Sequence, residues 1–144
     1  MLEFVAQNEP ACVPQLRKHV RDFLQGLRVD ASTTYDILLA TDEAAANAVA
    51  HGQSAGGNGH VRLRCSTEGA CVVVAITDEG QGFDPANVQM HRLPSWTSQG
   101  GRGLYLVREL MDEVHIDATP KGTLIEMRRQ VEVPRSTAVQ IPEP

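Results

Sequence analysis

Hydrophobic residues recur along this chain at two different periods, which separate expected helices from expected strands. From Asn8 or Glu9 to Gly26 the apolar residues follow a helical period and leave basic and acidic residues on the opposite face. Pro10 just inside the start and Gly26 at the end are typical helix boundaries. The pattern predicts an amphipathic helix whose buried face comprises Val13, Leu16, Val20, Phe23 and Leu24.

A second, longer helix is expected from Ala31 to His51, a run that contains no Gly or Pro. Asp30 or Ser32 would cap its start, and Gly52 would end it. A third helix is expected from Leu104 to Met111, where apolar residues again follow a helical period.

Alternating and continuous apolar runs predict strands between these helices. Leu2 to Ala6 is expected to be a short edge strand, and Val61 to Cys65 alternates as a half-buried strand does. Ala70 to Thr77 is almost wholly apolar, as in a central strand, and the turn at Glu68-Gly69 would join it to the preceding strand in a hairpin. Val114 to Ala118 and Thr123 to Val131 would form a final pair.

Composition narrows the class of protein. The 144 residues are enough for one domain, expected over residues 1–131, followed by a disordered, Pro-rich tail at 132–144. The net charge of −5 and the absence of a basic cluster argue against nucleic-acid binding. The sequence shows no signal peptide and no membrane-length apolar run, so we expect a soluble cytoplasmic protein.

Three polar residues of the long expected helix are the first candidate site. Glu43, Asn47 and His51 stand four apart, so they share one helical face, and their neighbours on that face are mostly alanines. A carboxylate, an amide oxygen and an imidazole in such an open setting suit a hydrated cation and a phosphate group. The same spacing also occurs on an ordinary solvated helix face.

A second candidate site follows the apolar strand. Asp78 comes at its end, before the sequence Glu-Gly-Gln-Gly-Phe that contains Gly80, Gly82 and Phe83. An aspartate there can accept a hydrogen bond from an exocyclic amine such as that of adenine, and glycines let a ligand approach the backbone. A simple hairpin turn fits the same residues.

A third candidate site is glycine-rich. Gly100, Gly101, Arg102 and Gly103 run directly into the helix that begins at Leu104. Free N–H groups at a helix start bind anions, and a guanidinium adds a charged fork for phosphate oxygens. A flexible linker before a helix is the alternative. Thr123 stands at the start of the last expected strand. Its hydroxyl would be a further candidate if it faces the same ligand as the other candidate residues.

Taken in their order along the chain, the three candidate sites and Thr123 resemble the four motifs of the ATP-binding fold of the GHKL superfamily (gyrase B, Hsp90, histidine kinases and MutL). Within it the chain is most similar to the small serine/threonine kinases of the RsbW and SpoIIAB type, which act as anti-sigma factors. The resemblance implies a two-layer α/β (α+β) sandwich of the Bergerat type, with a mixed or antiparallel sheet covered by three helices.

The resemblance also implies a role for each residue toward ATP and Mg²⁺. Asn47 would hold Mg²⁺, Asp78 would bind the adenine amine, and Thr123 would lie near adenine. Glu43 would be the base or orienting group for the hydroxyl of a protein substrate. The remaining expected nucleotide contacts are Gly80, Gly82, Phe83, Gly100, Gly101, Arg102, Gly103 and Leu104, with Arg102 at the γ-phosphate. His51 would either orient a phosphate or end its helix.

The implied function is phosphorylation of a STAS-domain anti-anti-sigma factor by a kinase that otherwise holds a sigma factor. A homodimer is expected because many relatives dimerise. Two alternatives stay open: a nucleotide-gated binding module without catalysis, and a related switch kinase that does not bind sigma.

Overall fold

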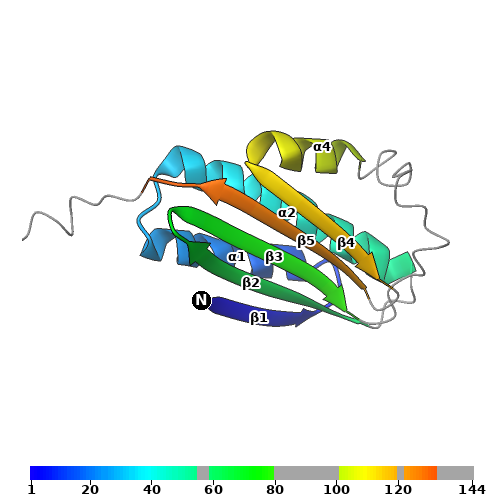
Figure 1. Cartoon of the computed structure of the whole chain (residues 1–144). Helices are drawn as coiled ribbons and strands as arrows, with labels where there is room; N and C mark the ends of the chain where they lie inside the picture. Colours follow the sequence, from blue (N-terminus) through cyan, green and yellow to red (C-terminus); the bar gives the residue numbers. More distant parts are fainter. Residues whose placement is uncertain (55–58, 80–100, 120–121, 133–144) are drawn as a thin grey trace, which may run out of the picture.

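An antiparallel sheet covered on one face by helices forms the frame of the molecule (Figure 1). The computed structural model describes residues 1–54, 59–79, 101–119 and 122–132. The elements are β1 (Leu2–Gln7), α1 (Cys12–Gly26), α2 (Ala31–Ser54), β2 (His60–Glu68), β3 (Cys71–Glu79), α4 (Gly101–Leu110), β4 (Glu113–Thr119) and β5 (Gly122–Gln130). This arrangement confirms the predicted two-layer α/β class, and every strand pairing of the described sheet is antiparallel rather than mixed.

The strand order β1-β2-β3-β5-β4 places β3 in the middle of the sheet. β3 pairs with β2 on one side and with β5 on the other, which explains its nearly continuous apolar sequence. The predicted hairpin of β2 and β3 and the predicted final pair of β4 and β5 are both present.

The core lies between the sheet and the helices. Leu16, Val20 and Leu24 of α1 are fully buried, as their spacing predicts. They pack with Ile37 of α2 and Leu63 of β2 in one continuous cluster. Burying a side chain of this size stabilises the fold by about 2 kcal/mol.

Three predicted helix boundaries are wrong: the starts of α1 and α4 and the end of α2. α4 begins at Gly101 rather than Leu104, because the glycine-rich segment forms its first turn. α1 begins at Cys12 rather than near Asn8 or Glu9, because Asn8 is buried at the end of β1 and bonds to other elements. α2 begins after Asp30 as predicted, with the Asp30 carboxylate accepting a hydrogen bond from Thr33 N at 2.9 Å. It continues through Gly52 to Ser54, although an internal glycine costs a helix about 1 kcal/mol relative to alanine.

The end of the sheet at which β5 finishes is held by an arginine. Arg129 Nη1 donates to the carbonyl of Leu110, the last residue of α4, at 2.6 Å and to Asp36 of α2 at 3.2 Å. Asp112 N donates to the Arg128 carbonyl at 2.8 Å nearby. β5 therefore holds the end of α4 and the beginning of α2 in place.

Among the helices of the described residues, none is long and apolar enough to cross a membrane.

Candidate functional site

Four elements that carry predicted site residues meet at one end of the sandwich (Figure 1). β3 and α2 end there, while β5 and α4 begin there, at the right of the view. Elements that lie far apart in sequence thereby meet at the same end of the sandwich.

The strand part of the site is formed by β3 and β5. Asp78 and Thr123 are direct partners across the two strands, and each side chain is only 3% exposed. Both face the helices, since their neighbours Thr77 and Leu124 line the opposite face and side chains alternate along a strand. The Thr123 hydroxyl finds no hydrogen-bond partner among the described residues. A buried carboxylate beside such a hydroxyl is a polar recess suited to a ligand that can donate and accept hydrogen bonds.

Gly122 allows these strands to come close together at this point. It has a φ of 154°, and a Cβ there would overlap the Asp78 carbonyl oxygen and lie 3.5 Å from Asp78 Oδ1. Position 122 therefore requires a glycine for steric reasons. The threonine that follows it lies directly beside Asp78.

The helical part of the site lies on the second half of α2. Asn47 is 6% exposed, and its Nδ2 donates to the Glu43 carbonyl oxygen at 3.2 Å. This bond uses one of the two amide N–H groups and orients the side chain, whose Oδ1 can act as an acceptor. Glu43 is half-buried, and its carboxylate makes no hydrogen bond or ion pair with any described residue.

Asp42, the residue before Glu43, has a different environment. Its Oδ2 pairs with Arg17 Nε of α1 at 3.2 Å, so it joins the two helices. Burial raises the pKa of the Asp42 carboxyl, and the Arg17 charge opposes that effect. Of these two adjacent acids, Asp42 is tied to α1 through Oδ2, whereas the Glu43 carboxylate has no ion pair with a described residue.

His51 lies one turn beyond Asn47 and is half-buried near the end of α2. Burial lowers the pKa of its imidazole below the ordinary value of 6.5. The ring is therefore neutral near pH 7, so it can donate a hydrogen bond from one nitrogen and accept one at the other. Because α2 continues past His51, the residue does not end the helix.

The glycine-rich segment forms the first turn of α4. Gly101, Arg102 and Gly103 are the first residues of that helix, and Leu104 is 4% exposed in the core. The helix begins directly with Gly101, which leaves the first backbone N–H groups without partners inside the helix. The predicted positions Gly80, Gly82, Phe83 and Gly100, as well as the side chain of Arg102, lie outside the described part of the chain.

The described residues fit a magnesium nucleotide better than a metal ion alone. Within 1–54, 59–79, 101–119 and 122–132 no group of three or more His, Cys, Asp or Glu residues could hold a metal. Mg²⁺ commonly takes one or two protein ligands and completes its shell with water and substrate phosphates. The Asn47 amide oxygen is a ligand atom of the kind that such a site uses.

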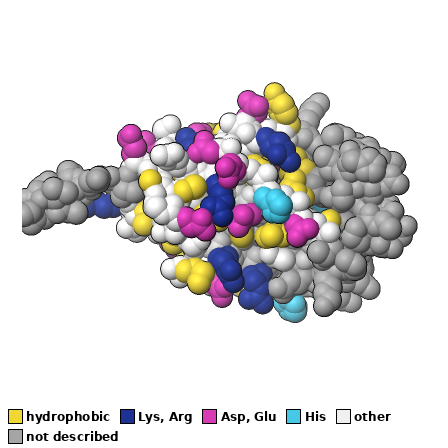
Figure 2. All heavy atoms as spheres, viewed as in Figure 1, with side chains coloured by type: hydrophobic (Ala, Val, Ile, Leu, Met, Phe, Trp, Pro, Cys, Tyr) yellow, Lys and Arg dark blue, Asp and Glu magenta, His cyan; other side chains and the backbone are white. Residues whose placement is uncertain are grey.

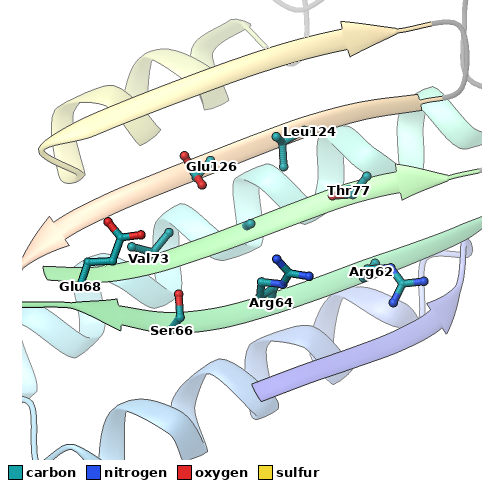
Figure 3. Close-up of a pocket in the computed structure, with 9 residues that line it drawn as sticks. Arg62, Arg64, Ser66, Glu68, Val73, Thr77, Leu124 and Glu126 are labelled. Carbon is teal, nitrogen blue, oxygen red and sulfur yellow. The ribbon is translucent and has the colours of Figure 1, made fainter. Parts of the chain in front are cut away.

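A shallow cavity of about 330 Å³ lies on the other face of the sheet (Figure 3). Arg62 and Arg64 of β2 and Glu126 of β5 point toward it. Basic and acidic side chains are intermixed with hydrophobic ones over this face (Figure 2). The cavity lies on the side of the sheet away from Asp78 and Thr123, so it is distinct from the candidate nucleotide site.

Asn8 lies next to the last turn of α2, a position that its local sequence does not predict. Asn8 is 3% exposed and contacts Gly52, next to His51. A glycine inside a helical run that is otherwise free of glycine was the available signal, and we interpreted it as a helix end.

Comparisons with known proteins agree with this geometry. Residues 6–129 match the model of the histidine kinase-like ATPase domain. The chain is 34% identical to serine-protein kinase RsbW of Bacillus subtilis over 125 residues, which are 79% of this chain and 78% of that protein. It is 26% identical to the anti-sigma F factor of Clostridium beijerinckii, over 92% of this chain and 94% of that one.

A solved structure shows the same fold in a longer protein. The RsbU and RsbW domains of Rv1364c from Mycobacterium tuberculosis superpose with a TM-score of 0.67 at 21% identity. That match covers 92% of this chain and 32% of the longer one. From the matched domain and the relatives, the chain belongs to the histidine kinase-like ATPase domain family and, within it, to the family of the RsbW serine-protein kinases.

Proposed function

We propose that this chain is an ATP-dependent serine/threonine-protein kinase and anti-sigma factor that phosphorylates a STAS-domain anti-anti-sigma factor. Relatives named serine-protein kinase RsbW and anti-sigma F factor support this proposal. The observation that carries it is the hydrogen bond from the Asn47 side chain to the Glu43 carbonyl oxygen on α2, the helix that ends where β3 ends and β5 begins with the paired Asp78 and Thr123.

Each residue has a role in the proposed reaction. Asp78 accepts a hydrogen bond from the adenine amine, and Thr123 lies beside the base. The Asn47 oxygen would hold Mg²⁺, which supplies charge neutralisation at the phosphates. The first turn of α4, with Arg102, binds the phosphate oxygens through N–H groups and positive charge.

Glu43 is the proposed base. Its carboxylate orients the serine or threonine hydroxyl of the protein substrate and takes the proton as the oxygen attacks the γ-phosphorus. The bond between that phosphorus and the β,γ-bridging oxygen breaks, and ADP leaves. Phosphoryl transfer depends mainly on positioning and on stabilising charge, which these groups provide. ATP and sigma factors share the cytoplasm, so we place the proposed reaction there.

A phosphorylation assay tests the proposal. The pure chain is incubated with Mg²⁺, γ-labelled ATP and STAS-domain proteins from the same genome. Label is expected on a Ser or Thr of one of them. Transfer should be lost in Glu43→Ala and kept in Glu132→Ala, a control that removes an exposed acid just beyond β5, at the opposite end of the sheet.

The other outcomes distinguish the alternatives. ATP binding without transfer to any STAS protein would refute the kinase and favour the nucleotide-gated binding module. Transfer without capture of any sigma factor by the chain would favour a switch kinase that does not bind sigma.

We also propose that two copies associate. The sheet face that bears the cavity is not covered by any described helix and presents acidic and basic side chains together (Figure 2). A second copy could place Glu126, the one acid of its β5, opposite the arginines Arg62 and Arg64 of β2. Light scattering after gel filtration should give twice the chain mass of 15.7 kDa. A monomer at all concentrations would exclude this association.

A further inference from the structure

Asn8 links three parts of the fold just beside the site. It follows β1 directly, and its backbone N–H donates to the Gly59 carbonyl oxygen, just before β2, at 3.0 Å. Its side-chain Nδ2 donates to the Ala48 carbonyl oxygen of α2 at 3.1 Å, in a buried setting. One buried side chain therefore connects the edge of the sheet to the last turns of α2.

Gly52 makes room for that side chain. A Cβ at Gly52 would overlap Nδ2 and Cγ of Asn8 and lie 2.7 Å from Oδ1, far inside contact distance. At Gly26, the glycine that ends α1, an added Cβ would meet no atom within 4 Å. The glycine in α2 is thus required by its contact with Asn8 and not by a helix end.

The two contact points on α2 adjoin two residues of the proposed nucleotide site. Ala48 directly follows Asn47, and Gly52 directly follows His51. A helix is stiff over a single turn, so its backbone cannot move at Ala48 and Gly52 while Asn47 and His51 stay in place.

We infer that the contact between Asn8 and Gly52, the Asn8–Gly52 clip, sets the position of Asn47 and His51 relative to Asp78 and Thr123. Asn8 is then a positioning residue for the magnesium nucleotide. It acts through α2 and does not touch the ligand. This inference rests on the proposed function, since it assigns the clip to nucleotide binding.

Nucleotide binding to the purified full chain tests the inference. Asn8→Ala removes the donor to Ala48, and we expect the affinity for MgATP to fall about 10-fold, as for other residues that support a metal ligand. The affinity for ATP in EDTA should change much less, because Asp78 and Thr123 are untouched. Gln7→Ala is the matched control, since it shortens an exposed amide at the preceding position and should bind MgATP as the wild type does.

A double variant separates positioning from folding. Gly52→Ala places a methyl group against Asn8 and should weaken MgATP binding. Asn8→Ala combined with Gly52→Ala gives that methyl group space and should bind MgATP more tightly than Gly52→Ala alone. This comparison stays informative if one single variant is poorly folded.

Two results would overturn the inference. One is wild-type MgATP affinity in folded Asn8→Ala; the other is a double variant that binds no better than Gly52→Ala alone. If the first result comes with a loss of thermal stability, the clip serves folding only. Failure of the wild-type chain itself to bind MgATP would instead refute the proposed function, so the two failures are distinguishable.

Discussion

At the level of single residues, partners decide which polar groups are available to a ligand. Asp42 is bound to Arg17, whereas Glu43 beside it has no partner among the described residues. The Thr41 hydroxyl likewise donates a hydrogen bond to the Ile37 carbonyl oxygen at 2.8 Å. The buried Thr123 hydroxyl, in contrast, has no hydrogen-bond partner among the described residues. Residue types alone do not reveal these differences, because both members of each pair are chemically alike.

Replacement of Thr123 by valine should separate stability from binding. Valine has the same shape and removes a buried hydroxyl that lacks a protein partner, so the free energy of unfolding should stay unchanged or rise by about 1 kcal/mol. ATP affinity should fall about 5-fold, as expected for loss of one hydrogen bond of about 1 kcal/mol. Urea unfolding and calorimetric titration measure the two quantities. A stability loss with unchanged affinity would make Thr123 a packing residue only.

The imidazole of His51 should make stability depend on pH. Burial lowers its pKa in the folded chain below the ordinary value of 6.5. Between the two values the unfolded chain binds a proton that the folded chain does not, so stability is greatest above pH 6.5 and falls as the pH drops through it. His51→Gln should show a smaller loss of unfolding free energy from pH 7.5 to 5.5. His115→Gln, which removes an exposed imidazole from β4, controls for the loss of a histidine as such.

At the level of elements, the sequence predicted what depends on local pattern. The strands of the two hairpins and the start of α2 after Asp30 follow from alternation and capping, and the structure has them. The reason for a glycine inside α2 could not be predicted from the local sequence, because Gly52 makes room for Asn8, which is 44 positions earlier. β5 also pairs with β3, which is distant in sequence, and no local sequence pattern predicts this pairing.

The arginine that joins β5 to two helices should contribute more to stability than an exposed arginine of the same sheet. The Arg129–Asp36 pair is 22% and 29% exposed and also bonds to Leu110, whereas the Arg64–Glu3 pair is 54% and 40% exposed. We expect Arg129→Met to lower the free energy of unfolding by about 2 kcal/mol. Arg64→Met should lower it by less than about 1 kcal/mol.

Urea denaturation of both variants beside the wild type gives this comparison directly. Equal losses would mean that Arg129 does not hold the end of α4. Methionine keeps much of the aliphatic stem of both arginines, so the difference reports mainly the guanidinium contacts.

At the level of the whole molecule, the candidate site joins both layers of the sandwich at one end. Asp78 and Thr123 belong to the sheet, whereas Glu43, Asn47 and His51 belong to a helix packed on it. A nucleotide that contacts both layers would hold them together, so its binding should be visible in the unfolding of the entire chain.

Saturation with MgATP should therefore raise the melting temperature. At 100 times its Kd, a ligand specific for the folded state adds about 2.7 kcal/mol of stability. For a chain of this size that corresponds to a rise of about 5–10 °C. Asp78→Asn should show little of this rise at the same MgATP concentration, as measured by calorimetry. An equal rise in wild type and variant would mean that Asp78 does not contact the nucleotide.

The cross-strand partnership of Asp78 and Thr123 also limits how the chain can change in length. A strand that slips by one residue turns every side chain to the other face, so Leu124 would replace Thr123 beside Asp78. An inserted residue within β5 would disturb either the core or the polar recess beside Asp78, so the length of β5 is constrained as well as its sequence.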